Sequence, residues 1–198
     1  MKDFEELYPL SKKISSLVGE AIRDYSMIRP GDKLMIGLSG GKDSLLLSLA
    51  LAVLRKRSPL KFGLEACLVD QSAGSMQTEA VASYMEQLGI PLRQMQHDTY
   101  QIIAGRGERS PCSLCANLRR GILASAAQRQ GCNVLALGHH KDDAAETVLL
   151  NLFYEGRFKC WHPHMYMTRS GIRVVRPLVY VEERKIILEA RRLGLPVT

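Results

Sequence analysis

The sequence lacks the segments that carry proteins across or into a membrane. No apolar run reaches the ~20 residues that a transmembrane helix needs, and no basic N-terminal segment leads into a secretion signal. We therefore expect a cytoplasmic protein with no membrane partner. In that reducing compartment, the five cysteines predict metal ligands, redox groups or core residues rather than a disulfide framework.

The composition is that of a single globular domain with an anionic partner. The chain has 198 residues, of which 46% are hydrophobic and 24% charged, enough for one well-buried α/β domain. Its net charge of +7 favours nucleic acid over a membrane surface, because no basic amphipathic segment stands alone.

Short apolar segments alternate with helical patterns along the chain, and no internal repeat is present. This alternation predicts an α/β fold with a doubly wound parallel sheet. The expected strands are residues 34–38, 64–70, 91–96 and 133–137. The helices expected between and after them are residues 45–54, 78–88, 117–130 and 144–154.

The two ends of the chain depart from this alternation. Apolar residues at helical spacing predict an N-terminal helical extension, so we divide the chain into residues 1–30 and a domain of residues 31–198. A hairpin is expected over residues 165–176, followed by an amphipathic helix over residues 181–193. The chain then stops where a further strand is expected, which suggests truncation.

The turn after the first strand has the composition of a phosphate-binding loop. Ser39-Gly40-Gly41 follows the strand, and Lys42-Asp43-Ser44 opens a leucine-rich helix. Free backbone N–H groups and the positive end of the helix attract an anion, and the glycines permit its close approach. The spacing is neither that of a Walker A loop nor G-x-G-x-x-G. The alternative is a glycine-rich turn whose polar residues only cap the helix.

Cys112 and Cys115 form a C-x-x-C pair at the start of a predicted helix. Two thiolates at this spacing can share one metal ion or cluster, and Arg119 and Arg120 would lower their pKa values. One pair does not complete a tetrahedral zinc site. A redox pair and two incidental cysteines remain as alternatives.

Polar residues also gather at the ends of two other predicted strands. Asp142 and Asp143 begin a helix after Gly138-His139-His140, where they either bind Mg²⁺ or nucleotide, or only complement the helix dipole. The two histidines either contact nucleotide or cap and pack. Asp70, which ends the second strand, is a candidate nucleotide contact or a turn former.

These motifs, in this order and spacing, resemble the PP-loop ATP pyrophosphatases, and among them the tRNA 2-thiocytidine synthetases. The likeness includes residues 39–44, 111–122, 138–147 and 173–178. It implies an adenine nucleotide alpha-hydrolase-like fold, with Lys42 and Asp43 in catalysis and Asp43 on Mg²⁺. The ATP-binding residues implied are Leu38, Ser39, Gly40, Gly41, Lys42, Asp43, Ser44, Asp70, Gly138, His139, Asp142 and Asp143.

The resemblance also implies a [4Fe-4S] cluster held by three cysteines, with one iron left open for sulfur. Cys112 and Cys115 match the first two ligands and would be catalytic, while the family's third ligand lies beyond residue 198. Cys160, in a loop with two histidines, is a lesser candidate for that place. The implied partners are tRNA, a sulfur donor (a cysteine desulfurase or sulfide) and a second copy of the chain. The candidate RNA-binding residues are Arg119, Arg120, Arg157 and Arg173.

The function predicted is ATP-dependent sulfur transfer to an anticodon-loop cytidine of tRNA. ATP would adenylate the C2 oxygen, and sulfur carried by the cluster would then replace it. Two alternatives remain. One is a PP-loop enzyme that adenylates a different nucleoside or a small metabolite. The other is a truncated, non-catalytic protein that binds ATP or an Fe–S cluster.

Overall fold

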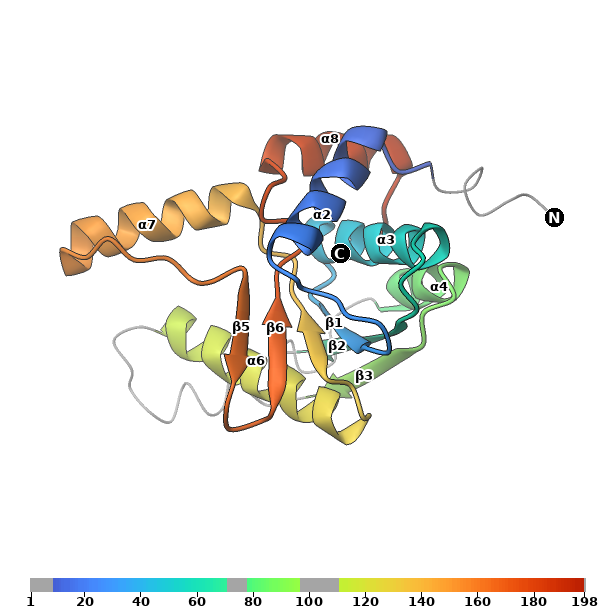
Figure 1. The fold of residues 1–198 in the computed structure, drawn as a ribbon, viewed down its shortest axis with the longest axis horizontal. Coiled ribbons are helices and arrows are strands. Elements are labelled where there is room, and N and C mark those ends of the chain that lie inside the picture. The colour runs from blue at the N-terminus through green and yellow to red at the C-terminus, as the bar shows by residue number, and fades with distance from the viewer. Residues whose placement is uncertain (1–8, 71–77, 97–110, 198) are drawn as a thin grey trace.

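The computed structural model describes residues 9–70, 78–96 and 111–197, with the side chains of residues 70, 96 and 111–117 left aside. A six-stranded sheet runs through it in the order β3-β2-β1-β4-β6-β5 (Figure 1). Every pairing is parallel except that of β5 with β6. The strands are β1 (Lys33–Leu38), β2 (Gly63–Asp70), β3 (Leu92–Gln96), β4 (Val134–Ala136), β5 (His164–Met167) and β6 (Ile172–Val175). The predicted doubly wound class is confirmed.

Helices cover both faces of this sheet. Figure 1 shows α2, α3, α4 and α8 on one face and α6 on the other. Along β1, Leu34, Ile36 and Leu38 pack under the first group, while Met35 packs under α6. Because β1 is a central parallel strand buried on both faces, nearly all of its residues are apolar. The helices are α2 (Lys12–Asp24), α3 (Lys42–Arg57), α4 (Glu79–Gln87), α6 (Pro111–Arg129), α7 (Lys141–Glu155) and α8 (Glu183–Leu193).

Helix α2 belongs to the same core as the sheet. Its residues Ile14, Val18 and Ile22 are buried with those of α3 and α8. The backbone N–H of Ser11 also donates to Glu189 Oε1 over 2.7 Å, which ties the start of α2 to α8. The boundary between residues 1–30 and the domain of residues 31–198 stays a prediction. The hydrophobic core is continuous across it.

Helix α7 is the exception to this packing. It projects from the body beyond the β5 edge of the sheet (Figure 1), and none of its residues is buried. Only its N-terminal turn lies against the carboxyl end of β4, where it can contribute to a site. In the described ranges, no helix combines the length and apolarity needed to cross a bilayer.

The strand order places a crevice between β1 and β4. From β1 the chain winds outward through β2 and β3, and it then returns to place β4 on the other side of β1. At this reversal the connections leave on opposite faces, so the carboxyl ends of the two strands stay uncovered. The residues following β1 and β4 are those singled out in the sequence.

The opposite, amino-terminal edge of the sheet is closed by a buried ion pair. Asp32 is 5% exposed and accepts hydrogen bonds from Arg173 and from Asn133 Nδ2. Burial alone would raise the pKa of Asp32, but the hydrogen bonds from Arg173, the Arg29 backbone and Asn133 outweigh it and lower the pKa. This pair joins the start of β1 to β6.

We expect Asp32→Ala to destabilise the fold by about 3 kcal/mol, because it leaves the largely buried Arg173 side chain without its counter-charge. Urea unfolding measures the change. Glu20→Gln, which removes an exposed charge on α2, is the control and should change stability by less than about 0.5 kcal/mol. Equal stability of the two variants would contradict a structural role for the pair.

Candidate active site

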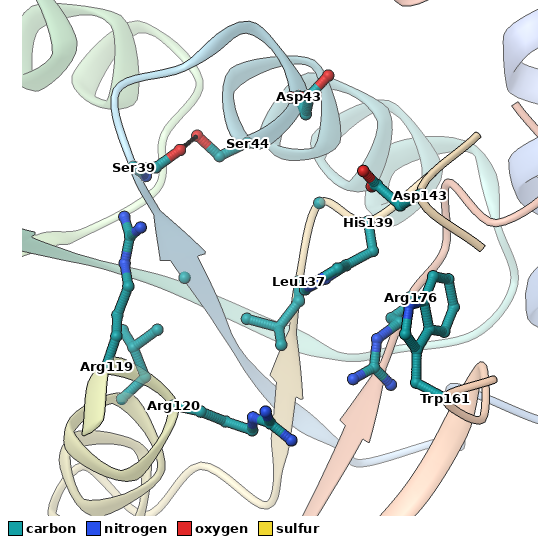
Figure 2. Close-up of a pocket in the computed structure, with 13 residues that line it drawn as sticks. Ser39, Asp43, Ser44, Arg119, Arg120, Leu137, His139, Asp143, Trp161 and Arg176 are labelled. Carbon is teal, nitrogen blue, oxygen red and sulfur yellow. Dashed lines mark hydrogen bonds between the residues drawn. The ribbon is translucent and has the colours of Figure 1, made fainter. Parts of the chain in front are cut away.

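The phosphate loop, residues 39–44, is organised by its own hydroxyl groups. Ser44 Oγ donates to the Gly41 carbonyl over 3.0 Å and accepts from the Ser39 backbone N–H at 3.2 Å. Ser39 Oγ lies 3.3 Å from Ser44 Oγ and accepts from the Gly41 N–H (Figure 2). Gly40 has a φ of 78°, which a residue with a side chain rarely adopts. The loop thus ends at the N-terminus of α3, where the first turn leaves backbone donors unpaired within the helix.

Gly138 allows the end of β4 to press against this loop. A Cβ atom at Gly138 would lie 3.1 Å from both the carbonyl carbon of Asp43 and the nitrogen of Ser44. Backbone atoms cannot move aside as a flexible side chain can. Glycine is therefore required for the close approach that brings residues 138–143 beside the phosphate loop.

A cavity of about 370 Å³ opens at this switch point. We call it the switch-point cavity. Figure 2 shows the phosphate-loop side chains on one side, Arg119 and Arg120 from α6 on another, and Trp161 with Arg176 opposite the loop. Its lining residues are Gly37, Ser39, Asp43, Ser44, Arg119, Arg120, Leu123, Leu137, Gly138, His139, Asp143, Trp161 and Arg176.

His140 lies between two carboxylates beside the phosphate loop. This histidine is 5% exposed and caps α7: its backbone N–H donates to Asp143 Oδ2 at 2.8 Å, and its ring Nδ1 accepts from the Asp143 N–H at 3.4 Å. A neutral ring that accepts at Nδ1 carries its proton on Nε2. That Nε2 lies 3.8 Å from Asp43 Oδ1 and 3.6 Å from Asp143 Oδ2. His140 thus orients Asp143, and its Nε2 lies near Asp43.

Asp43 retains an open coordination position. Its Oδ1 is buried and accepts no hydrogen bond, although Lys42 Nζ lies 3.2 Å away. A carboxylate oxygen of this kind, with Asp143 close by, suits a hard cation such as Mg²⁺. Lys42 itself also pairs with Glu183 at 2.9 Å. Burial would lower the pKa of Lys42, but its hydrogen bonds to Glu183 and Asp43 prevail and raise the pKa, so the ammonium stays charged.

The wall opposite the phosphate loop is built from Trp161, Arg176 and His139. The Arg176 guanidinium lies 4.7 Å from the centroid of the Trp161 ring. The His139 ring packs against the same Trp161 ring in an edge-to-face arrangement, with 5.5 Å between the ring centroids. The Trp161 ring is held by a hydrogen bond from Nε1 to Thr147 Oγ1 at 3.1 Å. Burial, and next the charge of Arg176, lower the pKa of His139 to about 4, so its ring is neutral at pH 7.

The depressed pKa of His139 predicts a loss of stability on acidification. The unfolded chain takes up the proton at about pH 6.5 and the folded chain only near pH 4, so stability falls between these values, by at most about 3 kcal/mol. We expect His139→Gln to remove this part of the loss. Urea unfolding at about pH 7 and about pH 5 measures it, and identical pH dependence in the two proteins would contradict the prediction.

Most of the residues predicted from the sequence meet in the switch-point cavity. Ser39, Asp43, Ser44, Arg119, Arg120, Gly138, His139 and Asp143 line it. Leu38, Gly40, Gly41 and Lys42 adjoin it within β1, the phosphate loop and the first turn of α3. Asp70 ends β2 at the same edge of the sheet, and its side chain lies outside the described residues.

Three predicted residues lie elsewhere. Asp142 points to α8, where its Oδ2 accepts from the Glu183 N–H at 2.6 Å, so the structure gives it a capping contact rather than a place in the cavity lining. Arg173, expected to bind RNA, is 12% exposed and paired with Asp32 at the other edge of the sheet. The structure shows an ion pair for Arg173, and its role in RNA binding stays a prediction. Arg157 is exposed just after α7.

The C-x-x-C pair starts the helix that walls the cavity. Cys112 and Cys115 lie in the first turns of α6, and Arg119, one turn further on, donates from Nη2 to the Leu38 carbonyl at 3.1 Å. The pair is thus on the right element for a cluster beside the cavity, while its side chains lie outside the described residues. Elsewhere in the described chain, Cys67 and Cys132 are core residues, and the Cys160 thiol donates to the Ala144 carbonyl at 3.5 Å. No group of three metal-binding side chains occurs among the residues described.

The wall opposite the phosphate loop has no clear signal in the sequence. Trp161 was not assigned to any site, and Arg176 received no place in the nucleotide pocket. One signal was available for Arg176, which directly follows a buried apolar strand, as Ser39 and Leu137 do. The carboxyl ends of parallel strands lie at one edge, so a polar residue in that position is a site candidate.

Comparison with known proteins identifies the same family that the sequence motifs resemble. A family model described as a PP-loop domain matches residues 9–196. The tRNA-cytidine(32) 2-sulfurtransferase of Geobacter sulfurreducens is 45% identical over 190 residues, which cover 94% of this chain and 73% of that protein. The protein of that name from Alkalilimnicola ehrlichii is 42% identical, covering 96% and 62%. The chain thus spans between about three fifths and three quarters of the length of these relatives.

Solved structures agree with these matches. The U34-tRNA thiolase NcsA from Methanococcus maripaludis, solved with its [4Fe-4S] cluster, superimposes with a TM-score of 0.75 at 26% identity, covering 94% of this chain and 65% of that one. An NH3-dependent NAD synthetase from Campylobacter jejuni (TM-score 0.56, 18% identity, covering 98% and 75%) shares the fold. The chain belongs to the PP-loop domain family, in the branch of the tRNA-cytidine(32) 2-sulfurtransferases.

Proposed function

We propose that this chain forms the ATP-binding, catalytic domain of an enzyme that converts a tRNA cytidine to 2-thiocytidine. The observation that supports it is the switch-point cavity. There the phosphate loop, the Asp43 and Asp143 carboxylates and the arginines of α6 face one space, and the C-x-x-C pair begins the helix that carries those arginines. The names of the relatives, which specify cytidine 32, point to the same substrate.

The phosphate loop would receive the β- and γ-phosphates of ATP. Unpaired N–H groups at the start of α3 and the charge of Lys42 stabilise the negative charge that builds on pyrophosphate as it leaves. Asp43 would hold the Mg²⁺ ion, which supplies further neutralisation of the phosphates. These groups are fixed before the reaction by the Ser39–Ser44 contacts and by His140, so little reorganisation is needed.

Two transfers account for the product. The C2 oxygen of cytosine attacks the α-phosphorus of ATP, the bond to the bridging oxygen breaks, and pyrophosphate leaves with the electron pair. A sulfur nucleophile at the oxidation level of sulfide then forms a bond to C2, and the C2–O bond breaks as AMP leaves. Adenylation is required because the C2 oxygen is a poor leaving group by itself.

Cys112 and Cys115 would hold a [4Fe-4S] cluster, as the family suggests, and the cluster would supply sulfur binding and Lewis acidity. The chain's own contribution is placement, because α6 carries both cysteines and also Arg119 and Arg120, which face the cavity. The sulfur donor and assembly as a homodimer are further parts of the proposal, and they rest on the family resemblance. The proposed cytoplasmic location rests on the sequence, in which no secretion signal or transmembrane run was found.

The test is nucleoside analysis of tRNA after reaction in vitro. Protein reconstituted anaerobically with iron and sulfide is incubated with ATP, Mg²⁺, sulfide and unmodified tRNA, and the digest is analysed by mass spectrometry. We expect 2-thiocytidine, formed only when ATP is present. Absence of any thionucleoside from a reconstituted protein that splits ATP to AMP would reject the proposal.

A second candidate is thiolation of a uridine. The structural match to a U34-tRNA thiolase favours it, since the fold and the cluster named for that protein would serve either pyrimidine. The same digest separates the two, because a uridine substrate would give 2-thiouridine. Transcripts with cytidine or uridine at position 32 or 34 would then identify the base.

A further inference from the structure

Arg176 is a buried cation with no counter-ion in the described part of the chain. It directly follows β6, is 2% exposed and lines the switch-point cavity. Its Nη1 donates to the His162 carbonyl at 2.6 Å, and one face of the guanidinium lies against the Trp161 ring. Its Nε is buried and has no hydrogen-bond partner. Neither contact neutralises the charge.

A buried charge is retained only where something compensates the cost of removing it from water. Burial, and next the charge of Arg120, lower the pKa of Arg176 to about 10, so the side chain remains a cation at neutral pH. Arg176 lies on the side of the cavity opposite the phosphate loop (Figure 2). An anion bound at this wall provides the missing compensation.

The orientation of the guanidinium identifies the kind of anion. Nη1 donates to the His162 carbonyl and Nε has no partner, so the edge that carries Nε–H and Nη2–H is the one whose hydrogen-bonding capacity is unfilled. Two parallel N–H groups on that edge match two oxygens of a phosphate. The ring of His139, which is neutral and has a buried, unpartnered Nδ1, packs against the same Trp161 ring and adds a hydrogen-bonding group to this wall without adding charge.

We propose that Arg176 binds the α-phosphate of the nucleotide, in a subsite separate from the phosphate loop that takes pyrophosphate. This inference rests on the proposed function. During adenylation the α-phosphate is transferred to the base, and during sulfur transfer it leaves as AMP, when its charge goes from one to two negatives. Arg176 stabilises that added charge, and Trp161 keeps the guanidinium plane in place.

The experiment uses the reconstituted protein and two probes, AMP and inorganic pyrophosphate, titrated by calorimetry. Arg176→Gln is expected to weaken AMP binding about tenfold or more, because a charge-assisted bidentate contact is lost. Pyrophosphate affinity should change by less than about twofold. Arg176→Lys keeps the charge but not the two parallel N–H donors, so its AMP affinity should lie between those of the parent and Arg176→Gln. Arg169→Gln, at an exposed turn arginine, is the control and should leave both affinities unchanged.

A second measurement needs no variant. Trp161 is the only tryptophan in the sequence, so its fluorescence reports on the Arg176 wall alone. Saturating AMP should change its emission, and pyrophosphate should not. If AMP binds by calorimetry without changing the emission, the subsite assignment is overturned even if the variants fail to fold.

The remaining outcomes also decide the question. Unchanged AMP affinity in folded Arg176→Gln overturns the inference, and so does an equal loss for AMP and pyrophosphate. Loss of affinity for a tRNA anticodon stem-loop with AMP binding intact would assign Arg176 to an RNA phosphate instead, which also overturns it. Loss of AMP affinity in a protein that makes no thionucleoside would support the subsite and reject the proposed function.

Discussion

Asp43→Asn is expected to reduce AMP formation from ATP by about a thousandfold. Asparagine keeps the size of the side chain and removes the charge that a divalent cation requires. The buried Oδ1 of Asp43 accepts no hydrogen bond and lies at the mouth of the phosphate loop, between Lys42 and His140. The substitution therefore removes the proposed Mg²⁺ ligand and leaves the hydrogen bonds between Ser39, Gly41 and Ser44 intact.

The measurement is the rate of AMP and pyrophosphate release with tRNA present. Glu155→Gln, which neutralises an exposed acid at the far end of α7, is the control and should retain the full rate. Thermal unfolding of both variants should be close to that of the parent protein. A normal rate of AMP formation in Asp43→Asn would show that this carboxylate does not carry the metal.

Cys112→Ser and Cys115→Ser are each expected to lower thiocytidine formation by more than about a hundredfold. Serine replaces a thiolate with a hydroxyl, which is a poor ligand for iron. Because both residues begin α6 and precede the arginines that face the cavity, the nucleotide site should remain. AMP and pyrophosphate affinities should therefore stay within about twofold of the parent.

Iron and sulfide content after anaerobic reconstitution gives a readout independent of activity. Both variants should hold much less iron than the parent. Cys160→Ser is the comparison, because its thiol donates to the Ala144 carbonyl and a hydroxyl can do the same, so iron should be retained. Loss of iron in Cys160→Ser, with iron retained in the other two, would move the metal site to the 160–164 loop.

Much of the nucleotide site could be predicted from the sequence because it is local. Strand, glycine turn and helix N-terminus are adjacent in the chain over residues 34–44, so the residues that make the phosphate loop also identify it. The same holds for His140 and Asp143, whose mutual hydrogen bonds span three residues. Apolar runs likewise predicted the buried strands and thus the fold class.

Two other predicted residues make contacts with distant segments that the sequence does not reveal. Asp142 caps a helix forty-one residues away, and Arg173 pairs with Asp32 across 141 residues. A charge on a strand or at a helix start has the same local pattern whether it faces a ligand, the solvent or a buried partner. Only the packing of β6 and α8 against the rest of the fold separates these cases.

The sequence by itself determined the α/β class, the position of the phosphate loop and the cysteine pair on α6, because short-range patterns encode strands, turns and helix ends. The tertiary structure alone decided which side chains share the cavity. Arg119 comes from α6, Trp161 from the segment before β5, and Arg176 from the end of β6. They meet because the strand order places β4 beside β1 and β6 beside β4. That order follows from the burial of whole faces of the sheet rather than from residues that are neighbours in the sequence.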